Sequence, residues 1–273
     1  MIDTSLFEGV LQIRMSRYAD FRQASWVCAY LVDGLLIDTG PAYTAEELTN
    51  FLKDKGVKVA VNTHFHEDHI SANKYLQDAY NIEIFAHPVA VDKINKSAKL
   101  YPYQEEVWGY PVPSQVKPVG NRITTQHCFF EVISTPGHDL DHICLFEVNK
   151  GWLFTGDLYV TTRPVVCRPN DDMWRTLEDL RKLRALSPRV IFPAPTHIVK
   201  EPNKKLDELT AYLEELGNRV DDLYNKGMNA EQIRDEVLGE EGLIADATQQ
   251  QFSSLNMVKS FLRKHKDHNG SRT

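Results

Sequence analysis

Apolar residues in the first two hundred positions come in short runs separated by turn residues. Residues 57–61 alternate between valine and polar or small side chains, which predicts a half-buried strand. Two further runs, residues 26–32 and 35–38, flank Asp33-Gly34, a dipeptide that favours a tight hairpin turn. The same criteria predict strands over residues 7–14, 82–86, 128–134, 142–148, 152–154 and 190–192.

Helical spacing of apolar residues appears between these strands and again after them. Residues 44–55 carry apolar side chains at helical spacing, and Gly56 suits the end of that helix. Residues 171–186 form an amphipathic pattern, and from about residue 203 to 265 leucines recur at helical steps among many charged residues. The chain is therefore predicted to mix strands and helices first and to end in helices alone.

Residues 98–120 differ in character from both kinds of segment. Three tyrosines and a tryptophan alternate there with four prolines, which indicates an ordered loop rather than a repeat. Such a loop forms an aromatic wall or lid over a pocket, or it packs on the sheet as a surface loop. The sequence leaves both interpretations open.

The most informative chemistry follows the strand at residues 57–61. The segment His64-Phe65-His66-Glu67-Asp68-His69 holds four potential metal ligands in six positions. In extended chain, side chains two residues apart point to the same side, so His64 and His66 can bind one ion together. Asp68 and His69 are expected to open a helix, which aims them at a neighbouring point. Imidazole and carboxylate ligands suit zinc, iron or manganese, and their clustering favours a metal site over ordinary loop polar groups.

His64-x-His66-x-Asp68-His69 resembles the signature of the metallo-β-lactamase-fold hydrolase superfamily, whose members include glyoxalase II-like and lactonase-like enzymes. The other expected elements follow predicted strands in the expected order: Asp38-Thr39-Gly40, Gly137-His138, Thr155-Gly156-Asp157 and Pro195-Thr196-His197. The resemblance implies an α+β fold, a four-layer αβ/βα sandwich with metals at one edge. It also implies a catalytic domain over residues 1–200 and a C-terminal helical extension over residues 201–273.

The resemblance also implies the site residues. One ion would be held by His64, His66 and His138, a second by Asp68, His69 and His197, and Asp157 would join the two. Zinc is the expected metal, with iron and manganese as alternatives. Asp38 would brace the ligand loop, and His142 is expected near the site without being a ligand.

Two ions about 3.5–4 Å apart can share a water and lower its pKa from about 15.7 towards 7. The expected activity is therefore hydrolysis of a small carboxyl derivative, which is a thioester, lactone or ester. Asp68 would orient the attacking hydroxide, and Tyr159 would polarise the substrate carbonyl or protonate the leaving group. Arg163 and Arg168 are surface arginines or contacts for an acidic substrate group. Alternatives are a phosphodiesterase using the same metals and a mononuclear-iron persulfide dioxygenase.

Net charge and composition limit the classes of partner and the cellular location that we expect for the protein. The 273 residues carry a net charge of −7, which argues against a non-specific nucleic-acid or anionic-membrane binder. Four isolated cysteines, without C-x-x-C spacing, suggest small buried side chains rather than disulfides. The N-terminus lacks the pattern of a signal peptide, and no run approaches the about 18 apolar residues of a membrane span. We expect a cytoplasmic protein that acts on a small-molecule substrate, and a homodimer is left open.

Overall fold

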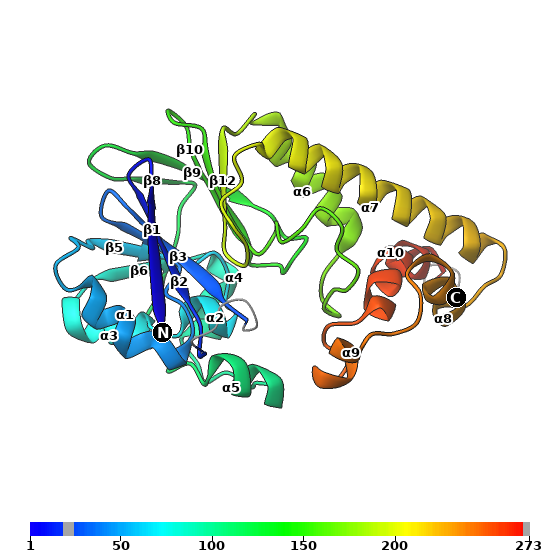
Figure 1. Cartoon of the computed structure of the whole chain (residues 1–273), viewed down its shortest axis with the longest axis horizontal. Coiled ribbons are helices and arrows are strands. Elements are labelled where there is room, and N and C mark those ends of the chain that lie inside the picture. The colour runs from blue at the N-terminus through cyan, green and yellow to red at the C-terminus, as the bar shows by residue number, and fades with distance from the viewer. Residues whose placement is uncertain (19–24, 270–273) are drawn as a thin grey trace.

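The computed structural model describes residues 1–18 and 25–269, and strands in this part of the chain form two sheets (Figure 1). The first sheet has the order β1-β2-β3-β4-β5-β6-β7. Its strands are β1 (Ile2–Phe7), β2 (Val10–Met15), β3 (Val27–Val32), β4 (Leu35–Ile37), β5 (Val59–Val61), β6 (Glu83–Ala86) and β7 (Lys117–Pro118). The second sheet has the order β12-β11-β10-β9-β8. Its strands are β8 (Arg122–Thr124), β9 (Phe129–Ser134), β10 (Ile143–Glu147), β11 (Trp152–Gly156) and β12 (Val190–Pro193).

The two sheets pack face to face around a common apolar core. Tyr30 of the first sheet lies in one buried cluster with Phe154 and Phe192 of the second sheet, and the rings of these two phenylalanines stack with centroids 4.7 Å apart. The Tyr30 hydroxyl also donates a hydrogen bond to the carbonyl of Pro193 over 2.6 Å. Burial of these large rings removes much apolar surface from water, and this fixes how the sheets lie on each other.

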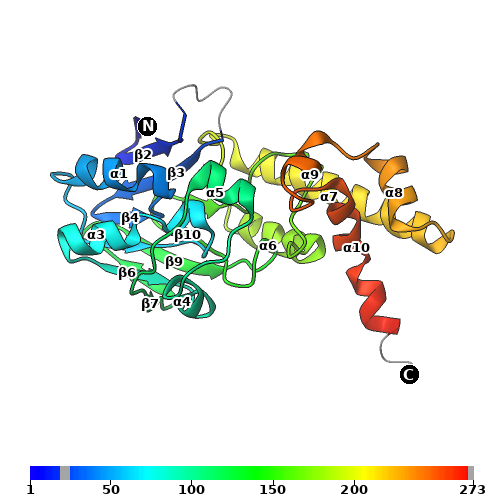
Figure 2. The same cartoon turned by 90° about the horizontal axis from the view of Figure 1, so that it is seen from below.

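Helices cover the outer faces of both sheets (Figures 1 and 2). The first sheet carries a short 3₁₀ turn (Ala42–Thr44), α1 (Ala45–Leu52), α2 (Glu67–Ile70), α3 (Asn73–Tyr80), α4 (Pro88–Ile94) and α5 (Pro102–Trp108) on its side of the molecule. Apolar residues of α1, α3 and α4 form a second buried cluster with that sheet. The second sheet shares a third cluster with α6 (Met173–Ala185) and with helices nearer the C-terminus. The order helix, sheet, sheet, helix confirms the predicted four-layer α+β sandwich.

The C-terminal part is helical, as its leucine spacing predicts. It comprises α7 (Pro202–Asn225), α8 (Ala230–Val237), α9 (Leu243–Ala247) and α10 (Ser254–Asn269). Figure 1 shows α7 running along α6 and beyond it, with α8 to α10 grouped below its far end. Gly217 lets this packing become tight, because a Cβ there would lie 2.8 Å from the ring of Phe261. The division at residue 200 stays a prediction, since α6 and α7 share one cluster.

Strand ends at one edge of the sandwich position the polar segments. β5 runs parallel to β4 and β6 and ends at Val61. Three residues later, at His64, begins the ligand segment, which comprises residues 64–69. The hairpin predicted at Asp33-Gly34 is present, and both residues have positive φ, 48° and 81°. Among the described residues, no helix is both long and apolar enough to cross a membrane.

Candidate metal centre

The ligand segment is held by a buried carboxylate. Asp38, at the end of β4, accepts the Thr63 main-chain N–H at 2.7 Å and the Thr63 hydroxyl at 2.8 Å. The same carboxylate lies 2.8 Å from Nδ1 of His69. Asp38 has a φ of 61°, a left-handed conformation that aspartate tolerates better than most residues. Its bracing role, implied by the resemblance, has a direct structural basis.

Two overlapping groups of side chains are suited to bind metal. In the first group, one donor atom each from His64, His66, His138 and Asp157 lie within 4.8 Å of one another. Asp68, His69 and Asp157 form the second group on the same criterion. The structure thus brings together six of the seven ligands that the sequence predicts, and Asp157 belongs to both groups.

Four donor atoms of this centre are buried and lack hydrogen-bond partners among the described residues. Nε2 of His64, Nε2 of His69, Oδ1 of Asp68 and Oδ1 of Asp157 have no hydrogen bond to any described residue. Nε2 of His69 and Oδ1 of Asp157 lie 3.2 Å apart, and Nε2 of His138 lies 3.8 Å from Oδ2 of Asp157. Buried polar atoms without partners are costly, so their convergence at one point fits a cation as the missing partner.

A second set of contacts orients the imidazoles. Nδ1 of His64 lies 3.0 Å from the Thr63 hydroxyl, and Nδ1 of His138 lies 3.4 Å from Oδ1 of Asp171. Together with the Asp38 contact to His69, these partners occupy Nδ1 and leave Nε2 facing the centre. Such outer contacts fix the ring orientation and the tautomer of metal-binding histidines.

His142 lies beside the centre as a supporting residue. Its Nδ1 lies 2.8 Å from the Thr135 hydroxyl, and its Nε2 accepts the main-chain N–H of Asp157 at 3.3 Å. Burial lowers the pKa of His142 well below its usual value, which keeps the ring neutral and able to accept this bond. His142 therefore positions the Asp157 loop, in keeping with its expected role outside the ligand set.

Burial and neighbouring charges set the protonation of the ligands. Burial lowers the pKa values of His64 and His66 well below the usual range, so both rings are neutral at pH 7, as metal binding requires. Burial also raises the pKa of Asp68 to about 7. Burial acts against the charge of His69, but the carboxylates of Asp157 and Asp68 outweigh it and raise the pKa of His69.

Two predicted site residues are not brought to the centre. His197 is exposed, and its ring packs at 5.4 Å on that of Trp26. The reason is local: Ile191 and Val199 exchange main-chain hydrogen bonds of 3.0 and 2.9 Å, which places His197 in a turn outside both ligand groups. Tyr159 is buried in the apolar cluster shared with α6 and α7, with the charges of Lys205 and Glu208 nearby. It faces that cluster rather than the ligands.

Several site residues escaped sequence analysis because only tertiary contacts reveal them. Lys93 of α4 contacts Asp139 at 3.3 Å and Asp141 at 3.4 Å, so these two carboxylates are buried and paired rather than facing water. Both oxygens of Glu67 accept from the Gln104 side chain at 2.9 Å. Neither the contact of Lys93 with the two aspartates nor that of Glu67 with Gln104 follows from a recognisable spacing in the sequence.

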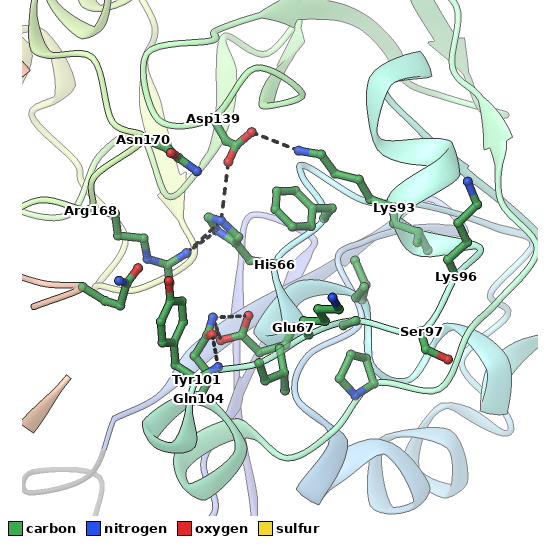
Figure 3. A pocket seen from close by; sticks show the side chains of 18 of the residues that line it. His66, Glu67, Lys93, Lys96, Ser97, Tyr101, Gln104, Asp139, Arg168 and Asn170 are labelled. Atoms are coloured by element: carbon green, nitrogen blue, oxygen red, sulfur yellow. Dashed lines mark hydrogen bonds and ion pairs between the residues drawn. The ribbon is translucent and has the colours of Figure 1, made fainter. Parts of the chain in front are cut away.

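A cavity of about 620 Å³ opens beside the ligands (Figure 3). His66, His138 and Asp139 form part of its wall, and residues 97–104 and 111–113 contribute much of the remainder. The aromatic segment therefore borders the pocket, as one of its two interpretations proposed. A second, smaller cavity of about 130 Å³ also reaches His138 and Asp157, and its walls are mainly apolar.

Comparisons with known proteins identify the family of this chain. The Metallo-beta-lactamase superfamily profile matches residues 28–195. A Drosophila melanogaster protein, "Beta-lactamase-like protein 2 homolog", is 26% identical over 187 residues, which cover 63% of this chain and 58% of the relative. "Hydroxyacylglutathione hydrolase" of Pelagibacter ubique is 30% identical over 115 residues, 41% of each chain. The chain thus spans about half the length of these curated relatives.

Solved structures agree on the fold. A metallo-beta-lactamase family protein from Thermus thermophilus superposes with a TM-score of 0.69 and 16% identity, covering 97% of this chain and 95% of that one. A beta-lactamase domain protein from Burkholderia ambifaria gives a TM-score of 0.71 at 14% identity, with 97% and 88% covered. With the ligand groups at the sheet edge and the family profile over residues 28–195, the chain belongs to the metallo-beta-lactamase superfamily.

Proposed function

We propose that this chain is a metal-dependent hydrolase of a small carboxyl derivative: a thioester, a lactone or an ester. The observation that carries the proposal is the convergence of four buried donor atoms, without hydrogen-bond partners among the described residues, beside a cavity of about 620 Å³. A similarity to hydroxyacylglutathione hydrolases, named for their action on a thioester, supports this substrate class.

The metals are part of the proposal. His64, His66, His138 and Asp157 would hold one divalent cation, and Asp68, His69 and Asp157 a second. Zinc is the first expectation because neutral imidazole and carboxylate are its usual nitrogen and oxygen ligands. A bound divalent cation supplies a Lewis acid that lowers the pKa of water and polarises the substrate's carbonyl oxygen.

The chain's own residues do the remaining work. Asp68 holds one buried oxygen without a hydrogen-bond partner in the described ranges. That oxygen is suited to accept a hydrogen bond from the attacking hydroxide and to orient it. The cavity would place the substrate beside His66 and His138, and residues 97–104 contribute to its wall.

The test is a metal-dependence experiment on a substrate panel. The purified protein is treated with a chelator, reloaded with zinc, manganese or iron, and assayed on thioesters, lactones, aryl esters and phosphodiesters. We expect hydrolysis of carboxyl derivatives only after reloading, and its loss in His66→Ala. His127→Ala removes an exposed histidine and serves as the matched control.

Full activity of the metal-free protein would contradict the proposal. Hydrolysis of phosphodiesters alone would instead favour the phosphodiesterase, and oxygen uptake with iron would favour the dioxygenase.

A further inference from the structure

Arg168 in the cavity wall forms no ion pair with a carboxylate of the described residues. Arg168 lies in the loop between β11 and α6 and points towards His66 (Figure 3). Its Nη1 is 2.7 Å from Nδ1 and 2.8 Å from Nε2 of His66, and its guanidinium lies 4.9 Å from the centre of the Phe252 ring. Its Nε is buried and has no hydrogen bond to any residue of the described ranges.

Burial lowers the pKa of Arg168, but the charges of Glu67, Asp68 and Asp171 outweigh burial and raise it, although none of these carboxylates pairs directly with the guanidinium. Glu67 accepts twice from Gln104, and Oδ2 of Asp171 accepts the main-chain N–H of Arg168 at 2.8 Å. Asp68 belongs to the second ligand group. Within residues 1–18 and 25–264, no carboxylate oxygen is paired with the guanidinium at 4.0 Å or less. The nearby carboxylates offset the cost of burying this cation, but the guanidinium keeps a buried N–H group that no described residue accepts, and arginine does not lose its proton.

The position of Arg168 beside the metal-binding group adds an electrostatic cost. His66 belongs to the first ligand group, so a cation held there would lie near the guanidinium. Two positive charges in a poorly hydrated site repel each other, and an anion between them offsets the repulsion. The planar guanidinium suits a carboxylate well because it can donate two parallel hydrogen bonds.

Two of the three lysines in the cavity wall, Lys93 and Lys96, already have acidic neighbours, and the third, Lys99, is exposed to solvent. Lys93 contacts Asp139 and Asp141, and Lys96 contacts Asp92 at 3.2 Å. Arg168 contacts the ligand His66, so it is better placed than these lysines to receive an anion close to where the substrate would react.

We propose that Arg168 is the anion-binding subsite of this active site and receives a carboxylate that the substrate carries on its acyl part. This inference rests on the proposed hydrolase function and narrows its substrates to anionic acyl compounds.

A matched pair of esters tests the proposal. 4-Nitrophenyl hydrogen adipate and 4-nitrophenyl hexanoate both have six-carbon acyl chains, which end in a carboxylate or in a methyl group. We expect Arg168→Met to lower kcat/KM for the adipate ester at least about tenfold more than for the hexanoate ester, as loss of a charge-assisted hydrogen bond implies. Arg168→Lys should retain part of the preference. Arg163→Met, an exposed arginine of the same loop that packs on Tyr212, should leave both esters unchanged.

A binding measurement separates this inference from the proposed function. Adipate is titrated by calorimetry into chelator-treated protein, where hydrolysis plays no part. We expect wild type to bind adipate and Arg168→Met to bind it at least about tenfold more weakly. If wild type hydrolyses neither these esters nor any carboxyl derivative of the substrate panel but shows this difference in adipate binding, the hydrolase proposal fails and the subsite stands.

Two results would overturn the subsite. One is equal adipate binding, or none, in wild type and Arg168→Met. The other is an equal loss of both esters in Arg168→Met with a parallel fall in metal content, because Arg168 would then only support His66.

Discussion

Replacing Asp38 by asparagine tests how the outer contacts control metal binding. Oδ2 of Asp38 faces both the Thr63 hydroxyl at 2.8 Å and Nδ1 of His69 at 2.8 Å. Asparagine keeps the size of the side chain and tolerates the positive φ of 61°. With its carbonyl oxygen still on the Thr63 main-chain N–H, its amide group would face the ring of His69 and could not accept a hydrogen bond from it.

The size of the effect follows from that lost bond. A hydrogen bond to a charged group contributes about 1.5–3 kcal/mol. Loss of an outer partner of a metal-binding histidine typically lowers metal affinity about 10- to 100-fold. Tenfold corresponds to about 1.4 kcal/mol, so the two ranges agree. We therefore expect Asp38→Asn to weaken zinc binding about 10- to 100-fold.

Zinc affinity would be measured by competition with a chromophoric chelator. Asp33→Asn is the matched control, because Asp33 also has a positive φ and accepts hydrogen bonds, from Thr125 and His127, but lies away from the ligands. An affinity for Asp38→Asn within about threefold of wild type would refute the reasoning. Equal weakening in both variants would show a general loss of stability instead.

Three further changes test the surroundings of the centre. Gly137→Ala should destabilise the fold by about 1–3 kcal/mol in denaturant unfolding, because its Cβ would lie 2.5 Å from main-chain atoms of Thr176, whereas Gly120→Ala meets open space. Burial raises the pKa of Asp141 to about 7. Between about pH 4 and 7, this carboxyl group is therefore protonated in the native metal-free protein and ionised in the unfolded chain. The stability of the wild type should thus fall as the pH rises from about 4 to 7. Asp141→Asn lacks this titration, so its melting temperature minus that of the wild type should increase over the same range. His197→Ala should keep the metal content of wild type by elemental analysis.

Each of these has a contrary outcome. Equal stability of the two glycine variants would show that the close approach of Gly137 to Thr176 does not require glycine. A melting-temperature difference for Asp141→Asn that is constant with pH would mean that this carboxyl does not titrate in that range. Loss of half the metal in His197→Ala would restore its predicted ligand role and show that the turn moves when metal binds.

The fold and most of the centre follow from local sequence. The four ligands of residues 64–69 lie in one segment directly after a strand, and His138 and Asp157 also follow strands. Strand ends of this kind meet at one edge of the sandwich, so the family pattern was sufficient to identify them.

The remaining features depend on contacts between distant segments. The position of His197 depends on main-chain pairing between Ile191 and Val199, which leucine and valine spacing does not reveal. Tyr159 is buried by helices that follow it by some fifty residues. The sequence allows Arg168 to be either a surface arginine or a contact for an acidic substrate group, and only its contact with His66 places it at the cavity.

Metal stoichiometry tests the central claim most directly. Purified wild type, His64→Ala and Asp157→Asn would be equilibrated with zinc, dialysed and analysed by inductively coupled plasma mass spectrometry, with His127→Ala as the control. Both ligand groups contain Asp157, and His64 is a fully buried member of the first. We predict stoichiometric zinc in wild type and in the control, and a clear loss in both ligand variants. Equal zinc in all four proteins, or none in wild type, would contradict the account.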